Sequence, residues 1–330
     1  MSVWRNKVIF ITGANGFLGS HLVKKALTYK SKVIVLIKED IGFSLFKIDK
    51  LAGKCKIYKG DLSDNKLINT IFKDNKIDIC FHVAAQAIVG VANNSPLGTF
   101  KTNIEGTWNV LEASRVYGIK AIIVASSDKA YGQHKKLPYK EDAPLNALHP
   151  YDASKSCTDI LSRTYAHTYK LPVAVTRCAN IYGPGDSNLS RIVPGTCSSI
   201  IAGQSPIIRS DGSPLRDYIF INDVVTAYFT LAKSLLEKKI KPGEAFNFGV
   251  DNPVSVLDLV RKIIKISGNK ELAPIIIGKG KIKGEIDKQY LSSLKAKKVL
   301  GWRPEHSLKE GLEITYKWHK CYGQRSQYEK

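Results

Sequence analysis

The chain has 330 residues, enough for one large domain or two smaller ones, and its 44% hydrophobic content is that of an ordinary globular protein. No apolar stretch reaches the roughly 18 to 20 residues that a membrane helix needs, and the first apolar run leads into a glycine-rich turn rather than a signal-peptide cleavage site, so we expect a cytoplasmic protein. The net charge of +21 comes from lysines and arginines spread along the chain, a pattern typical of a solvated surface that predicts neither a nucleic-acid nor a membrane partner.

The first predicted unit, residues 7–27, combines a strand, a glycine-rich turn and a helix. The apolar run of residues 8–11 is followed by Gly13, Gly16 and Gly19, and then by apolar residues at helical spacing. Glycines in this context let the backbone turn tightly and approach a pyrophosphate, which would lie at the unpaired N–H groups of the helix start. The pattern therefore predicts a dinucleotide-binding turn.

A second strand is predicted within residues 31–40, and its end bears on which dinucleotide is bound. An acidic side chain there suits the adenosine ribose of NAD, whereas a basic one suits the 2′-phosphate of NADP. Lys38, Glu39 and Asp40 offer both kinds of charge. We expect NAD, and NADP stays open.

Strands and helices continue to alternate. Further strands are predicted within residues 56–62, 77–85 and 120–127, with helical patterns between them. This alternation predicts a Rossmann-type doubly wound parallel sheet with helices on both faces. Ligands of such sheets bind beyond the carboxyl ends of the strands, which is where Gly13 and Ser127 fall.

Tyr151 and Lys155 are four residues apart, one helical turn, so both side chains can point the same way. Oxidising a secondary alcohol needs a base for the hydroxyl proton, and an ordinary tyrosine is phenolate in only about one molecule in a thousand at pH 7. The ammonium of Lys155 and a positive nicotinamide ring would lower the pKa of Tyr151, and Ser127 could share a hydrogen bond with the same substrate hydroxyl. A tyrosine and a lysine at this spacing are by themselves a common surface feature. Because they follow a predicted dinucleotide-binding fold here, we expect them to be a catalytic pair.

The motif TGANGFLG, Ser127 and the Tyr151–Lys155 pair resemble the extended short-chain dehydrogenase/reductase superfamily and, within it, the NAD-dependent epimerase/dehydratase family. The nucleotide-sugar epimerases and dehydratases of that family also resemble this chain at residues 177–186, 216–225 and 295–302. The pattern and the resemblance together imply the cofactor-binding residues, which are Gly13, Asn15, Gly16, Phe17, Leu18, Gly19, Lys38, Asp61, Leu62, Ala84, Ala85, Gln86, Asn103, Tyr151 and Lys155.

Two domains are expected from the change of pattern near Arg177. Residues 1–176 and 218–245 would form the Rossmann domain, and residues 177–217 and 246–330 a smaller mixed α/β substrate-binding domain. The diphosphate of a nucleotide-diphosphate hexose would be gripped by forked guanidinium groups. The expected substrate-binding residues are Asn180, Arg191, Arg209 and Arg216. Relatives often carry a further arginine where Asp287 and Lys288 stand here, so either Lys288 substitutes for it or the other arginines suffice.

In the 4,6-dehydratases of this superfamily, the catalytic Ser or Thr is followed by an Asp that protonates the departing C6 hydroxyl and usually by a Glu that takes the C5 proton. Here Ser127 is followed by Asp128 and Lys129, which resembles the CDP-glucose 4,6-dehydratase branch. Lys129 would either take the C5 proton or stabilise the enolate. The implied reaction is C4 oxidation by NAD with Tyr151 as the base, loss of water across C5 and C6, and hydride return to C6.

Other readings stay open. A UDP-sugar 4-epimerase would use Ser127, Tyr151 and Lys155 but give Asp128 and Lys129 no proton to move, leaving them as a surface ion pair. A non-catalytic dinucleotide-sensing protein would use only the cofactor site. The resemblance also implies a homodimer, paired through the helices that carry Asn103 and Lys155. The six cysteines and seven histidines lack ligand spacing, so we expect free thiols and no metal.

Overall fold

The computed structural model describes residues 3–278 and 286–323. Seven parallel strands form one sheet in the order β11-β6-β5-β4-β1-β2-β3. These strands are β1 (Val8–Thr12), β2 (Lys32–Ile37), β3 (Lys56–Lys59), β4 (Ile79–His82), β5 (Ala121–Ala125), β6 (Val173–Cys178) and β11 (Ala245–Phe248). The strand order reverses between β1 and β4, so the predicted doubly wound parallel sheet is confirmed, with its switch point beside the glycine-rich turn.

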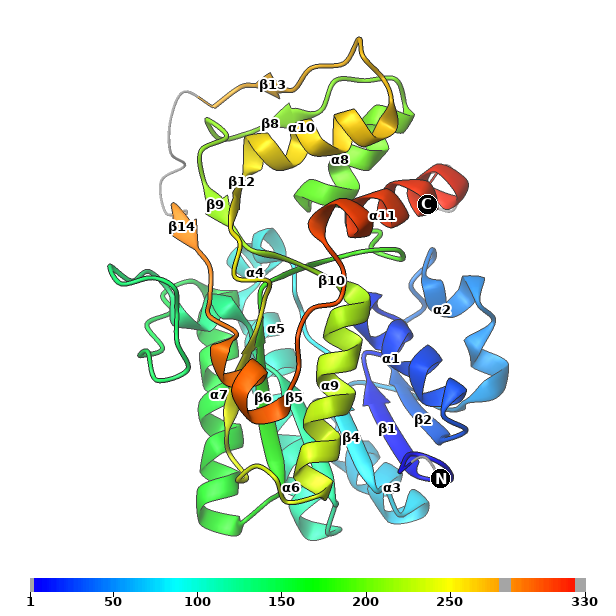
Figure 1. Ribbon diagram of the computed structural model, residues 1–330. Helices are drawn as coiled ribbons and strands as arrows, with labels where there is room; N and C mark the ends of the chain where they lie inside the picture. The colour runs from blue at the N-terminus through cyan, green and yellow to red at the C-terminus, as the bar shows by residue number, and fades with distance from the viewer. Residues whose placement is uncertain (1–2, 279–285, 324–330) are drawn as a thin grey trace.

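Helices cover both faces of the sheet (Figure 1). In β1, Ile9 and Ile11 face one side and Phe10 faces the other, and all three are completely buried. Strands buried on both faces explain the continuous apolar runs in the sequence. The first face carries α1 (Phe17–Thr28) and α9 (Ile221–Leu236), and the second carries α3 (Asn65–Asn75), α6 (Gly106–Val116) and α7 (Pro150–Tyr169).

A second group of elements lies beyond the carboxyl ends of the strands, above the sheet in Figure 1. Three helices pack around a separate apolar core: α8 (Ile192–Ile201), α10 (Val256–Ser267) and α11 (Leu308–Tyr322). Ser255 caps α10 by accepting a hydrogen bond from the backbone of Asp258 at 3.0 Å, and Gly268 ends that helix at a φ of 75°.

Short strands join the two groups. β9 (Leu215–Arg216) pairs antiparallel with β12 (Val254–Ser255) and parallel with β14 (Lys288–Gln289), which makes a small mixed sheet. The other strand pairs are β7 (Asn180–Tyr182) with β10 (Tyr218–Phe220), and β8 (Ile207–Ile208) with β13 (Ile275–Ile276). The remaining short helices and turns are α2 (Leu45–Ile48), α4 (Val89–Asn94), α5 (Pro96–Phe100), η1 (Leu51–Lys54), η2 (Lys101–Glu105), η3 (Asp128–Tyr131) and η4 (Ala296–Leu300).

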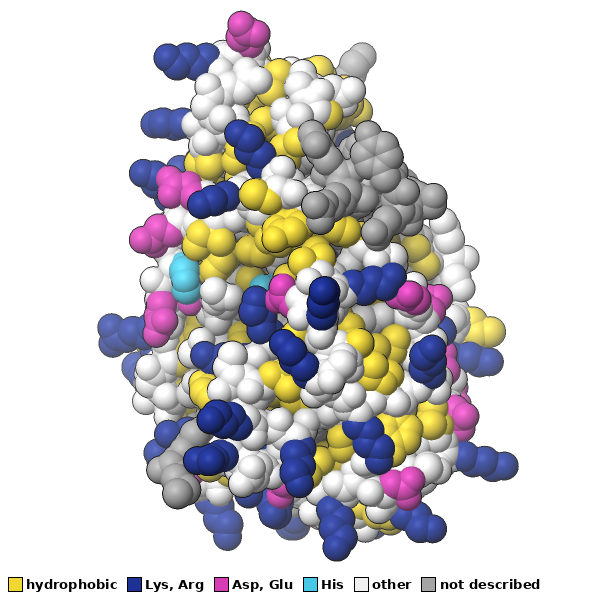
Figure 2. All heavy atoms as spheres, turned by 90° about the vertical axis from the view of Figure 1, so that its right-hand side faces the viewer, with side chains coloured by type: hydrophobic (Ala, Val, Ile, Leu, Met, Phe, Trp, Pro, Cys, Tyr) yellow, Lys and Arg dark blue, Asp and Glu magenta, His cyan; other side chains and the backbone are white. Residues whose placement is uncertain are grey.

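The surface carries the positive charge in a dispersed form. On the face shown in Figure 2, lysine and arginine side chains are scattered among neutral and acidic ones rather than gathered into one patch. Such a distribution is that of a solvated surface. Within the described ranges, no helix has both the length and the apolar content needed to cross a membrane.

Candidate active site

A cavity of about 1050 Å³ opens at the carboxyl ends of the central strands, between the sheet and the upper group of elements. It brings together most of the predicted residues, which are Gly13, Asn15, Gly16, Phe17, Leu18, Gly19, Lys38, Asp61, Leu62, Ala84, Ala85, Ser127, Asp128, Lys129, Tyr151, Lys155, Asn180, Arg191, Arg209 and Arg216. Gln86 and Asn103 are described but lie outside this lining. The buried amide of Asn103 donates to the carbonyl of Gln86 at 3.1 Å and accepts from its N–H at 2.8 Å, so it supports the loop after β4.

The turn between β1 and α1 forms a cradle of backbone atoms. Gly13 has a φ of 66°, and a Cβ there would lie 2.8 Å from the Cα of Ala84. A Cβ on Gly19 would lie 2.0 Å from the carbonyl oxygen of Gly13, because α1 begins directly against the turn. Gly16, Phe17 and Leu18 line the cavity at this helix start, where backbone N–H groups lack helical partners. This cradle fits the pyrophosphate of a dinucleotide.

Replacing Gly19 by alanine is expected to destabilise the fold by about 1–3 kcal/mol, the usual cost of overpacking, and to weaken dinucleotide binding. The added methyl group would collide with a backbone oxygen that cannot move without opening the turn. Urea unfolding and titration calorimetry with NAD measure the two effects. Gly53→Ala is the matched control, because an added Cβ there has no atom within 4 Å. Equal behaviour of the two variants would contradict the close approach.

The end of β2 carries a matched pair of charges. Lys38 Nζ lies 2.9 Å from Asp61 Oδ2, at the end of β3. The bond to Asp61 raises the pKa of Lys38; burial alone would raise the pKa of Asp61, but hydrogen bonds from Ser63 and Lys38 outweigh it and the pKa is lowered. Both side chains are therefore charged, and the lysine's charge is balanced by its neighbour.

The stretch after β5 holds a buried carboxyl group. Ser127 begins η3: its hydroxyl accepts a hydrogen bond from the backbone of Lys129 at 3.2 Å and donates one to Asp128 Oδ1 at 3.1 Å. Asp128 is only 3% exposed. Burial raises the pKa of Asp128, against the opposing charge of Lys129 and the bond from Ser127. The carboxyl group therefore holds its proton more readily than an ordinary aspartate does.

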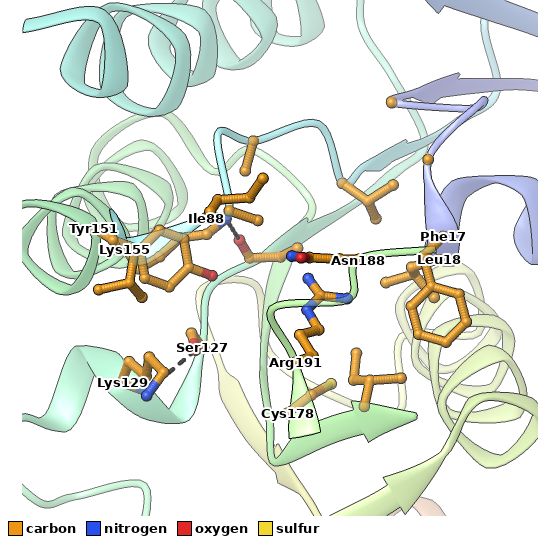
Figure 3. A pocket seen from close by; sticks show the side chains of 18 of the residues that line it. Phe17, Leu18, Ile88, Ser127, Lys129, Tyr151, Lys155, Cys178, Asn188 and Arg191 are labelled. Carbon is orange, nitrogen blue, oxygen red and sulfur yellow. Dashed lines mark hydrogen bonds between the residues drawn. The ribbon is translucent and has the colours of Figure 1, made fainter. Parts of the chain in front are cut away.

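Tyr151 lies in the first turn of α7, and its hydroxyl points toward Ser127 (Figure 3). The sequence predicts that the ammonium of Lys155 and a nicotinamide ring lower the pKa of Tyr151; in the protein alone, desolvation at this partly buried position is the largest effect and raises the pKa to about 12. The cation that opposes this rise is Arg191, which projects into the same cavity (Figure 3). The sequence predicts Arg191 only as a diphosphate ligand.

Lys155 anchors α7 to the sheet. It is 4% exposed, and its Nζ donates a hydrogen bond to the carbonyl of Ala125, the last residue of β5, at 2.6 Å. The neighbouring Ser126 hydroxyl donates to the carbonyl of Lys155 at 3.1 Å. Burial lowers the pKa of Lys155 from its ordinary 10.5 to about 8. These bonds fix Tyr151 relative to Ser127.

The buried lysine predicts a pH-dependent difference in stability. Between its folded pKa of about 8 and its ordinary value of 10.5, the unfolded chain binds more protons, so the free energy of unfolding rises with pH. Relative to Lys155→Met, we expect the wild type to gain about 3 kcal/mol between roughly pH 7.5 and 10.5 in urea titrations, since each pH unit is worth about 1.4 kcal/mol. The same substitution at exposed Lys66 should give no such gain. Parallel curves for wild type and Lys155→Met would show that burial does not penalise this ammonium.

Arg216 is held by the mixed sheet at the far side of the cavity. Its guanidinium donates to the carbonyls of Leu215 at 2.9 Å and Asp287 at 3.1 Å. Asp287 thus contributes its backbone to orienting this arginine. Lys288, the alternative phosphate ligand suggested by the sequence, is exposed on β14. Arg191 is bonded twice at 3.1 Å to the buried carboxylate of Asp186.

Among the lining residues that sequence reasoning missed, two lie close to the predicted catalytic residues. Asp152 is 6% exposed beside Tyr151, and its position next to that tyrosine was the only available signal. Gln289 is completely buried on β14, and nothing local in the sequence indicates it. Across residues 3–278 and 286–323, no cluster of three or more His, Cys, Asp or Glu side chains is arranged to hold a metal ion.

Comparison with known proteins shows the family to which the chain belongs. The NAD dependent epimerase/dehydratase family matches residues 9–249, more than half of the chain. The dTDP-D-glucose 4,6-dehydratase of Bos taurus is 28% identical, over 95% of this chain and 89% of that protein. The CDP-glucose 4,6-dehydratase of Salmonella typhimurium is 29% identical, over 97% and 92%. A crystal structure of UDP-glucose 4-epimerase from Thermotoga maritima with UDP-glucose has a TM-score of 0.86 and 32% identity, covering 95% of this chain and 99% of that one. Similar to dehydratases and epimerases alike, the chain belongs to the NAD dependent epimerase/dehydratase family.

Proposed function

We propose that the chain is a nucleotide-sugar 4,6-dehydratase that converts an NDP-hexose, with CDP-glucose as the first substrate to test, to the NDP-4-keto-6-deoxyhexose. The observation that carries this proposal is the buried Asp128. Its carboxyl group lies at the cavity wall, bonded to Ser127, toward which the hydroxyl of Tyr151 points, and burial raises its pKa. Expelling a hydroxyl group as water requires an acid that holds its proton beside the oxidising pair.

Each proton transfer of the proposed reaction is assigned to one residue at this end of the sheet. Tyr151, whose hydroxyl points toward Ser127, takes the proton of the C4 hydroxyl. The 4-ketone makes the C5 proton acidic, and Lys129 takes it as a free amine or stabilises the enolate as an ammonium. Asp128 gives its proton to the C6 hydroxyl, which leaves as water. NAD, when bound, supplies the acceptor for the hydrogen of C4 and the donor that reduces C6.

The described walls fit NAD. The backbone cradle of residues 13–19 would hold the pyrophosphate, and Asn103 would act through the loop that it supports. Lys38 supports NAD over NADP, because its charge is already balanced by Asp61 at 2.9 Å and Glu39 lines the cavity beside it. For the substrate, the three arginines at positions 191, 209 and 216 would hold the diphosphate, with Asn180 beside them.

A UDP-sugar 4-epimerase is the second candidate, favoured by the likeness to the UDP-glucose 4-epimerase structure. It would use Ser127, Tyr151 and Lys155 in the same way. It would give Asp128 no proton to deliver, so the raised pKa of this carboxyl group would have no task. Asp128 therefore favours the dehydratase.

Mass spectrometry of products formed in deuterated water tests the proposal. The purified protein is incubated with NAD and, separately, with CDP-, dTDP-, UDP- and GDP-glucose. Loss of one water with one deuterium at C5 is the expected result, and the fastest substrate identifies the base. An unchanged formula with a changed configuration at C4 would make the protein an epimerase. Tight NAD binding without any product would favour a dinucleotide-sensing protein.

We further propose that the chain forms a homodimer through α6 and α7. These neighbouring helices carry exposed apolar side chains, with Trp108 44% and Ile160 53% exposed. Ile160→Glu is expected to convert the dimer to a monomer in analytical ultracentrifugation, because a carboxylate would be buried in the contact. Ile207→Glu, at a 58% exposed position on β8, is the control and should leave the mass unchanged. A dimer that survives Ile160→Glu would place the contact elsewhere.

A further inference from the structure

Strand β14 brings a buried glutamine to the reactive edge of the cavity. β14 pairs in parallel with β9, with Lys288 opposite Leu215 and Gln289 opposite Arg216. Because side chains alternate along a strand, Lys288 is exposed, whereas Gln289 is completely buried and lines the cavity. A polar amide in such a place requires hydrogen-bond partners.

The carbonyl oxygen of the Gln289 amide is bonded to Lys129. Lys129 Nζ donates a hydrogen bond to Gln289 Oε1 at 3.3 Å, joining positions 160 residues apart. The contact fixes the orientation of the amide, since the reverse orientation would set its NH2 group against an ammonium that has only donors. Gln289 Nε2 is buried and has no partner among the described residues, which destabilises the fold. The amide is kept despite this cost with its oxygen toward Lys129, which indicates a task for that oxygen.

Charged groups of both signs surround the pair. Asp128 precedes Lys129 in η3, Asp152 and His149 come from the start of α7, and Arg216 comes from β9. A base for C5 has to change its own charge within this field during the reaction. It therefore needs a neighbour that can bond to the ammonium and to the free amine alike.

We propose that Gln289 is a positioning residue that keeps Lys129 aimed at C5 of the hexose in both protonation states of the lysine, an inference that rests on the proposed dehydratase function. Gln289 Oε1 accepts a hydrogen bond from an N–H of the ammonium and, after proton loss, from an N–H of the free amine, which leaves the lone pair of the amine to face C5. The C5 proton passes to that amine and the C–H electron pair forms the enolate with C4. The enolate then expels the C6 hydroxyl, which takes the proton of Asp128 and leaves as water. Leucine at this position can accept from neither form of the lysine, and glutamate, being charged, stabilises the ammonium over the free amine.

Two substitutions in the full chain test this role. Gln289→Leu is expected to slow C5 deuterium incorporation from CDP-glucose about tenfold or more while KM changes less than about threefold, as for losing a hydrogen bond to a charged group. In a Lys129→Met background the same substitution should have no further effect, because no partner is left to position. Gln289→Glu favours the ammonium, so the limb of the pH profile that rises with the free amine should move up by about one pH unit or more.

Chemical labelling, which needs no turnover, tests the contact between Lys129 and Gln289 independently of the proposed function. Acetic anhydride acylates an amine only in its unprotonated form, so labelling of Lys129 against pH, followed by peptide mass spectrometry, should also move to higher pH in Gln289→Glu. If the wild type forms no dehydrated product, the proposed function fails and the positioning role with it, while a moved labelling curve would still establish the contact. An unmoved labelling curve, an effect on KM alone, or an equal loss in the Lys129→Met background overturns the positioning role.

Discussion

Tyr151→Phe is expected to lower turnover by about 10²–10⁴-fold, the range typical of removing a positioned general base. The substitution deletes only the phenol oxygen, and Lys155 keeps its bond of 2.6 Å to the carbonyl of Ala125. The fold should therefore persist. The rate of 4-ketone formation from saturating CDP-glucose measures the loss, with thermal unfolding as the check on folding. A decrease smaller than about threefold would exclude Tyr151 as the proton acceptor.

The same tyrosine predicts how the wild-type rate changes with pH. Burial raises the pKa of Tyr151 to about 12, and the charge of Arg191 and the bond from Ser127 oppose that rise without overcoming it. Phenolate is then a minor form at neutral pH, and its fraction increases tenfold per pH unit. A rate limited by Tyr151 should rise with pH in proportion. Arg191→Met should lower kcat near pH 7 and move this limb to higher pH, whereas loss of a diphosphate contact alone would change KM.

Much of the cavity could be predicted because its residues are local in the sequence. Apolar runs show where parallel strands end, and those ends meet at one edge of the sheet, so the sequence alone places Gly13 and Ser127 together. The spacing of Tyr151 and Lys155 is one helical turn, and both lie on α7 and line the same cavity. Short-range patterns of this kind survive folding because the backbone itself enforces them.

What escaped prediction depends on long-range pairing and on burial. β14 has only two residues, too few for any periodicity, so the pairing of Gln289 with Arg216 has no signal in the sequence. The pKa of Tyr151 was misjudged for a related reason. Neighbouring charges can be guessed from motifs, but desolvation depends on how the whole chain closes over a side chain, and here it is the larger effect.

Asp128→Asn is expected to stop the loss of water while leaving C4 oxidation and C5 deprotonation in place. The amide has the shape of the carboxyl group and keeps an acceptor for the Ser127 hydroxyl, now bonded at 3.1 Å, but it has no acidic proton to give. Dehydrated product should fall by about 10²–10⁴-fold. In deuterated water, recovered substrate should still gain deuterium at C5, because that proton is removed before the hydroxyl group leaves. Mass spectrometry of product and recovered substrate measures both.

The pH dependence of the rate and a control variant make the Asp128→Asn test specific. Because burial raises the pKa of Asp128, its acid form is present below that pKa and is lost as pH increases through it, so the rise of the wild-type rate with the Tyr151 phenolate should level off above that pKa. Asp128→Asn should show no such levelling. Asp64→Asn, at the exposed cap of α3 where asparagine caps equally well, should behave as the wild type. If Asp128→Asn instead turned over at the wild-type rate and changed only the configuration at C4, the carboxyl group would have no proton to deliver and the reaction would be epimerisation.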